Sequence, residues 1–370
     1  ERIGPRWSST EAEATAIEYI REQMGRDGLD HVEVEPFELH TWSCERAEAV
    51  GDDGRAIDLT PFNRCPPCAL NATLVDVGFG TPREVEAARS ELDGAIAIMN
   101  MGHEPFTTPI PHNDRLVEIA AAGASAAICV DTKTGRRAEY HNAGEWRFPE
   151  TAEPPMPLGT TSREHGVLLR RLAAAGLKLQ LTVESRLYDA RSANVVGQLD
   201  GSLWPEEQLV IGAHHDTVMG APGGNDNSSG TIAVMETARV MASLKRDLGT
   251  APGRSIRFVT FAAEEQAFQG SLAYVRSHCG PERAPRLMLN LDELSTGYMK
   301  GVVLAFDHLR DLIQSQFDEM GDGLKCHVMA QLDAITCPTL VLSAEHDYTP
   351  LEEKEAYVCL LPDATFEVMA

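Results

Sequence analysis

The sequence predicts an α/β fold, a three-layer sandwich around a mostly parallel central sheet, with a small β-rich domain inserted into it. From residue 194 onward, short apolar runs alternate with amphipathic helical segments, a pattern typical of parallel strands joined by helices. The 370 residues, 43% hydrophobic and 24% charged, suffice for two globular domains. A turn-rich stretch near residue 60 precedes a second, distinct set of strand and helix signals.

Each element of the main domain follows from its periodicity and its end signals. An N-terminal helix is expected over residues 8–24, because Ser9 or Thr10 can cap it and apolar residues recur at helical spacing. The alternating segment 31–39 predicts a strand. Beyond residue 194 the expected strands are 209–213, 255–262, 286–291, 302–306 and 326–332, and the expected helices are 231–244, 269–277 and 309–320.

The inserted domain is expected between residues 61 and 189. Its predicted strands are 72–77, 94–99 and 126–130, and its predicted helices are 114–122 and 163–175. The main domain then comprises residues 1–60 and 190–333, and residues 334–370 form a separate C-terminal segment.

The net charge excludes two classes of partner. With 56 acidic and 32 basic residues, the formal charge is −24, which repels the phosphates of nucleic acids and of anionic lipid surfaces. No apolar run approaches the ~18 residues that span a bilayer. We therefore expect neither a nucleic-acid partner nor a membrane partner.

The eight cysteines give little information about function. Only Cys65 and Cys68 have the spacing of a motif. A zinc half-site would need a second pair of ligands nearby, and a redox pair would need a strand before it and a helix after it. We interpret the segment as a turn that holds either two thiols or a local disulfide.

Acidic and histidine residues follow the predicted strands of the main domain at the point where each strand ends. His214 and Asp216 follow strand 209–213, Asp226 lies in the glycine-rich loop before the next helix, and further acidic residues end the two following strands. Ligands bind at the carboxyl ends of parallel strands. Each group alone is typical of a solvated turn or a helix cap, but several carboxylates at one sheet edge need cations for neutralisation.

These segments together resemble the co-catalytic di-zinc exopeptidases, which include leucyl-type aminopeptidases, glutamate carboxypeptidase II and carboxypeptidase Q. The resemblance covers residues 4 to about 333 and rests on four ordered motifs, at residues 212–218, 225–230, 263–265 and 290–292. Residues 72–183 resemble the protease-associated insert of some members. The resemblance implies a zinc exopeptidase fold, a peptide substrate and an extracytoplasmic or secreted protein.

The resemblance also implies a role for each motif residue. The metal ligands would be His214, Asp226, Glu265 and Asp292. His214 and Asp292 would bind one zinc, Asp226 would bridge to a second zinc, and Glu265 would bind the second. Glu264 matches the general base, and Asp216 matches the carboxylate that orients His214. Because successive strand side chains point to opposite faces, adjacent Glu264 and Glu265 need an irregular strand end to share one site.

The C-terminal segment departs from this pattern. Residues 332–370 resemble the last part of an α/β-hydrolase, with Asp347 in the place of the acid. A serine hydrolase is excluded because the sequence has no Gly-x-Ser-x-Gly and no histidine after His346. The family's last zinc-binding histidine is missing after Asp333, and His346 and His327 are the nearest candidates to replace it. We therefore expect a weak second zinc site and impaired activity.

Two hypotheses remain on the sequence alone. The first is a zinc-dependent exopeptidase, for which we favour the aminopeptidase type. The second is a catalytically crippled or non-enzymatic binding protein that retains the peptidase fold. Metal content measured together with peptide hydrolysis distinguishes them, and the sequence decides neither the cleaved end of the peptide nor the preferred side chain.

Overall fold

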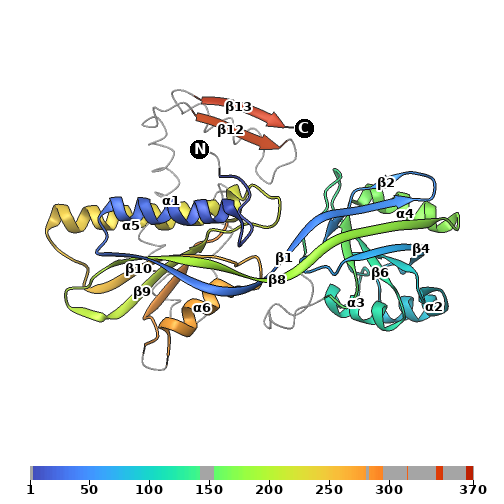
Figure 1. Ribbon diagram of the computed structural model, residues 1–370, viewed down its shortest axis with the longest axis horizontal. Helices are drawn as coiled ribbons and strands as arrows, with labels where there is room; N and C mark the ends of the chain where they lie inside the picture. Colours follow the sequence, from blue (N-terminus) through green and yellow to red (C-terminus); the bar gives the residue numbers. More distant parts are fainter. Residues whose placement is uncertain are drawn as a thin grey trace. The chain divides into compact units, whose positions relative to one another are not determined.

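The computed structural model of the chain (Figure 1) describes residues 3–141, 154–280, 283–294, 315, 339–344 and 364–369. The chain divides into two compact units, Glu1–Asp292 and Glu293–Ala370, and each is described by itself.

The first unit is built on one large mixed sheet. Its strand order is β11-β9-β10-β8-β4-β5-β6-β7-β3, and β1 pairs with β8 and β2 beside this path. The strands β9 (Trp204–His214), β10 (Arg254–Phe261) and β11 (Leu287–Asn290) are parallel to one another. The expectation of a mostly parallel sheet was too simple, because β8 (Lys178–Leu199) runs antiparallel to β1, β4 and β10.

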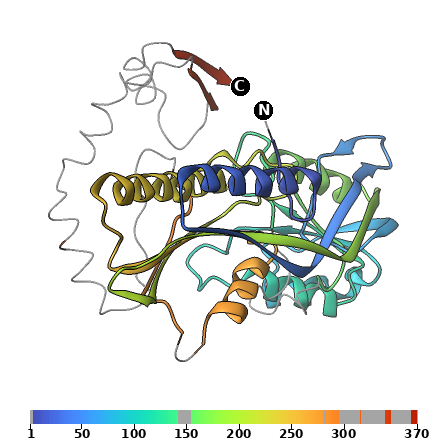
Figure 2. The same cartoon turned by 60° about the vertical axis from the view of Figure 1, so that its left-hand side comes forward.

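Helices cover both faces of the part of the sheet that contains β9, β10 and β11. In Figures 1 and 2, α1 (Glu11–Asp27) and α5 (Gly230–Leu248) lie side by side on one face, and α6 (Gln269–His278) lies on the other. Thr10 caps α1 through its side chain. Met24, Val234 and Phe258 are among the buried residues that join the two helices to the sheet. These layers agree with the predicted sandwich.

The longest strands were underestimated from the sequence. The strand β1 (His31–Gly51) and the strand β8 pair along nearly their whole length and carry the chain into and out of the insert. A bulge between Cys44 and Arg46 shifts their register. After Leu39, exposed polar residues interrupt the alternation of apolar and polar residues in β1. The sequence pattern therefore does not predict the second half of the strand.

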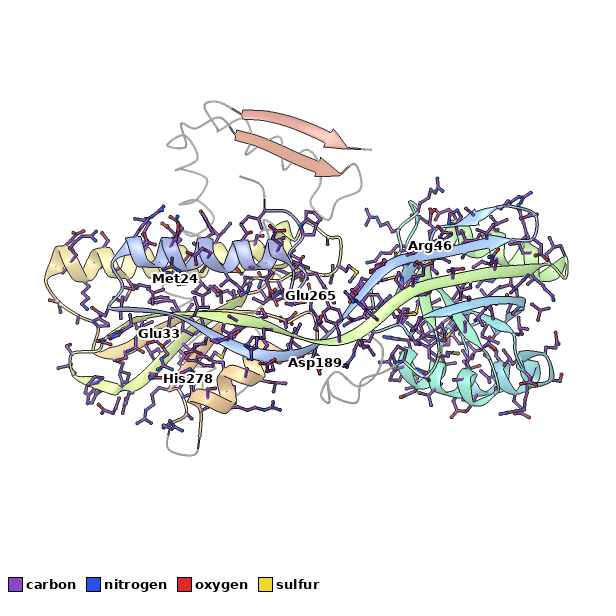
Figure 3. The ribbon with its side chains drawn as sticks, in the orientation of Figure 1. Met24, Glu33, Arg46, Asp189, Glu265 and His278 are labelled. Carbon is purple, nitrogen blue, oxygen red and sulfur yellow. The ribbon has the colours of Figure 1, made fainter. Side chains whose placement is uncertain are left out.

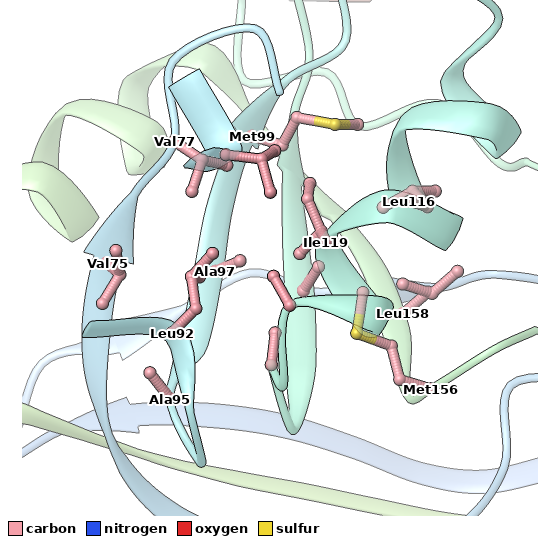
Figure 4. Close-up of a cluster of buried hydrophobic side chains, with 14 of the residues drawn as sticks. Val75, Val77, Leu92, Ala95, Ala97, Met99, Leu116, Ile119, Met156 and Leu158 are labelled. Atoms are coloured by element: carbon pink, nitrogen blue, oxygen red, sulfur yellow. The ribbon is translucent and has the colours of Figure 1, made fainter. Parts of the chain in front are cut away.

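Residues 56–174, which include most of the expected insert, form an α/β region with apolar clusters on both faces of its strands. Its strands are β2 (Ala56–Ile57), β3 (Thr60–Pro61), β4 (Cys68–Asp76), β5 (Ile96–Asn100), β6 (Ala126–Val130) and β7 (Leu158–Thr161). Its helices are α2 (Pro82–Leu92), α3 (His112–Ala121) and α4 (Arg163–Ala174). Leu92 and Ile119 pack one face of the sheet (Figure 4), and Leu169 packs the other. Of these helices, α2 was not predicted from the sequence.

The segment between Cys65 and Cys68 is a turn with two free thiols. The cysteines that the structure describes (Cys44, Cys65, Cys68, Cys129 and Cys279) are all free. Cys65 is buried and its sulfur accepts a hydrogen bond from the Leu158 amide at 3.4 Å. Burial raises the pKa of the Cys65 thiol to about 12, so this cysteine is neither a ready zinc ligand nor a redox nucleophile.

The second unit is described at two strands, β12 (Thr339–Ala344) and β13 (Ala364–Met369), which pair in parallel. The predicted strands 302–306 and 326–332 lie outside the described residues, as does the predicted helix 309–320 apart from residue 315. His327, His346 and Asp347 also lie outside the described residues.

Candidate metal centre

Three parallel strands deliver the predicted site residues to one edge of the sheet. The strand β9 ends at His214, and Asp292 follows the end of β11. The strand β10 ends at Phe261, and Ala263 then adopts a positive φ of 52°. This turn out of the strand is the irregularity that allows Glu264 and Glu265 to face the same site.

The buried imidazole of His214 faces several carboxylates. Its Nε2 atom lies 2.9 Å from an oxygen of Asp226, 3.6 Å from Asp292 and 3.8 Å from Glu264. The His214 side chain is only 2% exposed, whereas those of Asp226 and Asp292 are 47% and 39% exposed. The site therefore combines a buried nitrogen with carboxylates that are partly exposed to solvent.

The side chains form two overlapping groups of possible metal ligands. His214, Glu264 and Asp292 make one group, and His214, Asp226 and Glu265 make the other, with the ligand atoms of each group within 4.8 Å of one another. No further group of this kind occurs in the part of the chain that the structure describes. One imidazole with several carboxylates is a donor set that suits zinc. The structure thus brings together all four predicted ligands and Glu264.

Burial and neighbouring charges shift the pKa values of several groups in this site, of which Glu265 is labelled in Figure 3. Burial is the main cause that raises the pKa of Glu264 to about 7 and that of Glu265 to about 9. Burial opposes protonation of His214, but contacts with Asp216, Asp226 and Asp292 outweigh it and raise the His214 pKa. A cation would remove this repulsion because it neutralises the carboxylates together.

Asp216 contacts the second ring nitrogen of His214 and the backbone of the two glutamates. Its side chain is fully buried, and one carboxylate oxygen lies 3.3 Å from His214 Nδ1. The same carboxylate accepts hydrogen bonds from the backbone amides of Glu264 at 3.1 Å and Glu265 at 3.2 Å. The predicted orienting residue therefore contacts both the imidazole and the loop that carries the two glutamates.

Hydrogen bonds from a side chain to backbone groups fix the loops that carry Asp226 and Asp292. The side-chain amide of Asn227, next to Asp226, donates to the Leu291 carbonyl at 2.9 Å, and its oxygen accepts from the Gly230 amide at 2.9 Å. A Cβ atom at Gly230 would lie 2.1 Å from the Leu291 carbonyl, so only glycine fits there. The π-helical turn η1 (Gly224–Ser229) and the end of β11 are thereby tied together.

Part of the chain matches a known peptidase family. Residues 194–361 match the family model described as peptidase family M28. The match includes every predicted ligand and continues past residue 333 to residue 361.

Curated peptidases align with most of this chain. Carboxypeptidase Q from Homo sapiens is 27% identical over 288 residues, which cover 75% of this chain and 59% of the relative. Aminopeptidase YwaD from Bacillus subtilis (strain 168) is 28% identical over 307 residues, which cover 81% of this chain and 60% of the relative. This chain thus spans about three-fifths of the length of these relatives.

Solved structures share the fold. A zinc aminopeptidase from Bacillus subtilis superposes with a TM-score of 0.68 at 25% identity, over 87% of this chain and 74% of that one. An aminopeptidase from Aneurinibacillus sp. strain AM-1 gives a TM-score of 0.61 at 23% identity, over 99% of this chain and 82% of that one. The mixed α/β architecture with a large sheet is therefore that of M28 zinc aminopeptidases. Among the described residues, we find no helix with the length and apolarity that crossing a bilayer requires.

A buried arginine near the N-terminus supports the candidate metal centre, and the sequence interpretation missed it. Arg6 is 8% exposed. Its guanidinium donates to His215 O at 2.7 Å, Pro222 O at 3.3 Å, Gly223 O at 3.3 Å and Ser228 Oγ at 2.8 Å. These contacts join the loop after β9 to the turn that carries Asp226. No local pattern could reveal a partner more than 200 positions away along the chain.

A second missed residue is Glu13, a buried acid on the first turn of α1. Its carboxylate accepts hydrogen bonds from Ser8 Oγ at 2.8 Å, from the Ser9 amide at 2.6 Å and from Ser192 Oγ at 2.9 Å. It also lies 3.8 Å from Nε2 of buried His215. Burial, and then the charge of Asp216, raise the pKa of Glu13 to about 7. In the sequence Glu13 is typical of an ordinary helix N-terminus.

Proposed function

We propose that this chain is a zinc-dependent exopeptidase of the M28 type, acting on the amino-terminal residue of peptides. The observation that carries the proposal is the buried His214 imidazole, whose Nε2 faces the carboxylates of Asp226, Asp292 and Glu264. The M28 match and the similarity to zinc aminopeptidases support the choice of metal and of reaction. Carboxypeptidase Q relatives at similar identity leave a carboxypeptidase as the competing assignment.

The proposed ligands are His214, Asp226, Glu265 and Asp292. Bound zinc would polarise the scissile carbonyl and acidify the attacking water. Asp216 keeps the His214 ring in place, because a carboxylate at the far nitrogen of a ligating histidine fixes its tautomer and orientation. The charge of Asp216 lies behind the imidazole and raises its basicity as a ligand.

Glu264 is the proposed general base. Its carboxyl is partly buried and lies 3.8 Å from His214 Nε2, so it borders the position that the attacking water would take. It would take the proton of the attacking water and then deliver that proton to the leaving amine, so the carboxylate is regenerated in each turnover. Its amide is held by Asp216, which fixes the start of its side chain.

The two proposed zinc sites have unequal numbers of protein ligands. His214, Asp292 and the shared Asp226 would hold the first ion with three protein groups, whereas the second would have Glu265 and a share of Asp226. Zinc favours nitrogen ligands, so two carboxylates alone make a weak site. We propose that the second zinc binds more weakly than the first and that the chain is a slow enzyme. The rival proposal is a non-enzymatic binding protein with one metal.

We also propose that residues 61–189 are a protease-associated type of insert and that the protein acts outside the cytoplasm. The insert has its own core, and β1 and β8 connect it without a break to the part that carries the metal centre. Such a module can border the substrate site. Deletion of residues 61–189 is not a clean test, because it removes the half of β8 that pairs with residues 40–51 of β1.

The test uses the full chain, stripped of metal and then titrated with zinc. Zinc content is measured by mass spectrometry while hydrolysis of leucine p-nitroanilide is followed beside that of an N-blocked dipeptide with a free carboxylate. We expect one tight and one weak zinc, with hydrolysis of the free-amine substrate rising as the second site fills. Hydrolysis of the N-blocked dipeptide instead would indicate a carboxypeptidase. Bound zinc without hydrolysis of either substrate would support the binding protein.

A further inference from the structure

The turn after β10, which carries the two glutamates of the metal centre, is held by side chains from distant parts of the chain. The carboxylate of Asp216 accepts the amides of both glutamates. The amide of Ala262 donates to Asn194 Oδ1 at 3.0 Å, and the amide of Ala263 donates to Ser8 Oγ at 2.9 Å. Four consecutive amides of the turn therefore have side-chain acceptors, and the N-terminal segment supplies one of them.

The hydrogen-bonding direction of the Ser8 hydroxyl is fixed. Ser8 is fully buried, and its hydroxyl donates to Glu13 Oε1 at 2.8 Å. The Glu13 carboxylate is itself held by Ser192 Oγ at 2.9 Å and by the Ser9 amide at 2.6 Å. A hydroxyl has one hydrogen to donate, and an ionised carboxylate only accepts. The hydrogen of Ser8 is therefore committed to Glu13, and its lone pairs accept from the Ala263 amide.

Ala263 is the residue at which the chain turns out of β10 toward the metal centre. Its φ of 52° lies in the left-handed region, and a non-glycine residue stays there only where its surroundings hold it. The Ala263 carbonyl accepts from the Gln269 amide at 3.0 Å. Ala263 is fully buried, so no water can replace Ser8 as the acceptor of its amide. Loss of the Ser8 oxygen would release the residue that directs Glu264 and Glu265 into the site.

The same N-terminal segment also bonds to the loop after β9. The Arg6 amide donates to Thr217 Oγ1 at 2.9 Å, and the Thr217 amide donates to Arg6 O at 3.3 Å. Thr217 is fully buried. Residues 6–8 therefore connect two loops that follow neighbouring parallel strands and carry residues of the metal centre.

We propose that Ser8 is a positioning residue for the metal centre. Its hydroxyl fixes the Ala263 amide, and through it the placement of Glu264, the proposed base, and of Glu265, a proposed ligand of the second zinc. Ser8 acts through the backbone of the turn and not on the substrate. This inference rests on the proposed peptidase function and adds to it a residue near the N-terminus, more than 250 positions before the turn.

The test compares Ser8→Ala with Ser192→Ala in the full chain. Each variant loses a buried hydroxyl that donates to Glu13 Oε1, at 2.8 Å and 2.9 Å, but of the two hydroxyls only that of Ser8 also accepts from Ala263. In the zinc-loaded protein we expect Ser8→Ala to lower kcat about 10- to 100-fold with KM nearly unchanged, and Ser192→Ala to keep the parent kcat. Equal kcat values in the two variants would overturn the inference, as would a loss in Ser8→Ala that is confined to KM.

Hydrogen exchange of the metal-free proteins, followed by mass spectrometry, tests the same link without metal or activity. We expect the amides of residues 262–265 to exchange faster in Ser8→Ala than in Ser192→Ala, and equal exchange would overturn the inference. Ser8→Cys keeps the side-chain volume but offers only a weak acceptor, so it replaces Ser8→Ala if that variant does not fold. Failure of both to fold would make Ser8 a structural residue and overturn the inference. If the parent chain hydrolyses no peptide, the proposed function fails, and the exchange measurement still decides whether Ser8 holds the turn.

Discussion

Glu13 makes the stability of the metal-free protein depend on pH in a direction that can be calculated. Its pKa rises from 4.5 to about 7 on folding, mainly through burial. Folded protein therefore binds this proton more tightly than unfolded protein, so stability falls as pH rises from 4.5 through 7. One pKa unit is worth ~1.4 kcal/mol, which gives a total loss of about 3 kcal/mol, most of it between pH 5 and 8. The Glu13 side chain is 2% exposed, so solvent screens this effect little.

Glu13→Gln removes the charge and keeps an oxygen that can accept from Ser8 and Ser192. We expect the unfolding free energy of the variant, minus that of the parent, to increase by about 2 to 3 kcal/mol from pH 5 to pH 8. The assay is urea unfolding of protein kept in chelator, because a bound metal would change the local field. Glu11→Gln, on the exposed side of the same helix turn, is the matched control and should show no such increase. An identical difference at pH 5 and pH 8 would refute the assignment of a buried, ionising Glu13.

Three further predictions concern the centre itself. Glu264→Gln should abolish hydrolysis, whereas the zinc content, measured by mass spectrometry, should stay at the parent value because the base is not a ligand. Full activity of this variant would contradict the mechanism. Asp216→Asn should weaken zinc binding about 10- to 100-fold in chelator competition, as expected for loss of the carboxylate behind a ligating histidine; unchanged affinity would contradict its orienting role. In Arg6→Lys, one ammonium cannot bridge the loop after β9 and the turn that carries Asp226, so the visible spectrum of the cobalt-substituted protein should change. Arg21→Lys, on the outward-facing side of α1, is the control and should leave that spectrum unaltered.

The sequence predicted those elements whose periodicity is local. The strand β6 (Ala126–Val130) and the start of α6 at Gln269 agree with the expected ranges, because a buried apolar run and a helical stripe are each complete within a few residues. The ribbon of β1 and β8 was largely missed, because its pairing joins residues up to 167 positions apart and carries polar side chains on both sides. Here, tertiary pairing overrides local propensity.

The same distinction between local patterns and long-range contacts applies to the candidate metal centre. His214, Asp226 and Asp292 were foreseen because strand ends and a loop motif mark them in the sequence. Arg6 and Glu13 carry no such mark, since each contacts partners far along the chain. What identifies them is burial together with their hydrogen bonds, and these features exist only in the folded protein.

Zinc-edge anomalous diffraction from a crystal of the full chain grown with zinc tests the central claim most directly. The account predicts an anomalous peak at ~2.0–2.2 Å from His214 Nε2, with carboxylate oxygens of Asp226 and Asp292 completing its surroundings. A weaker peak beside Glu265 is expected for the second ion. The absence of any peak at His214, with its Nε2 still paired to Asp226, would contradict the account.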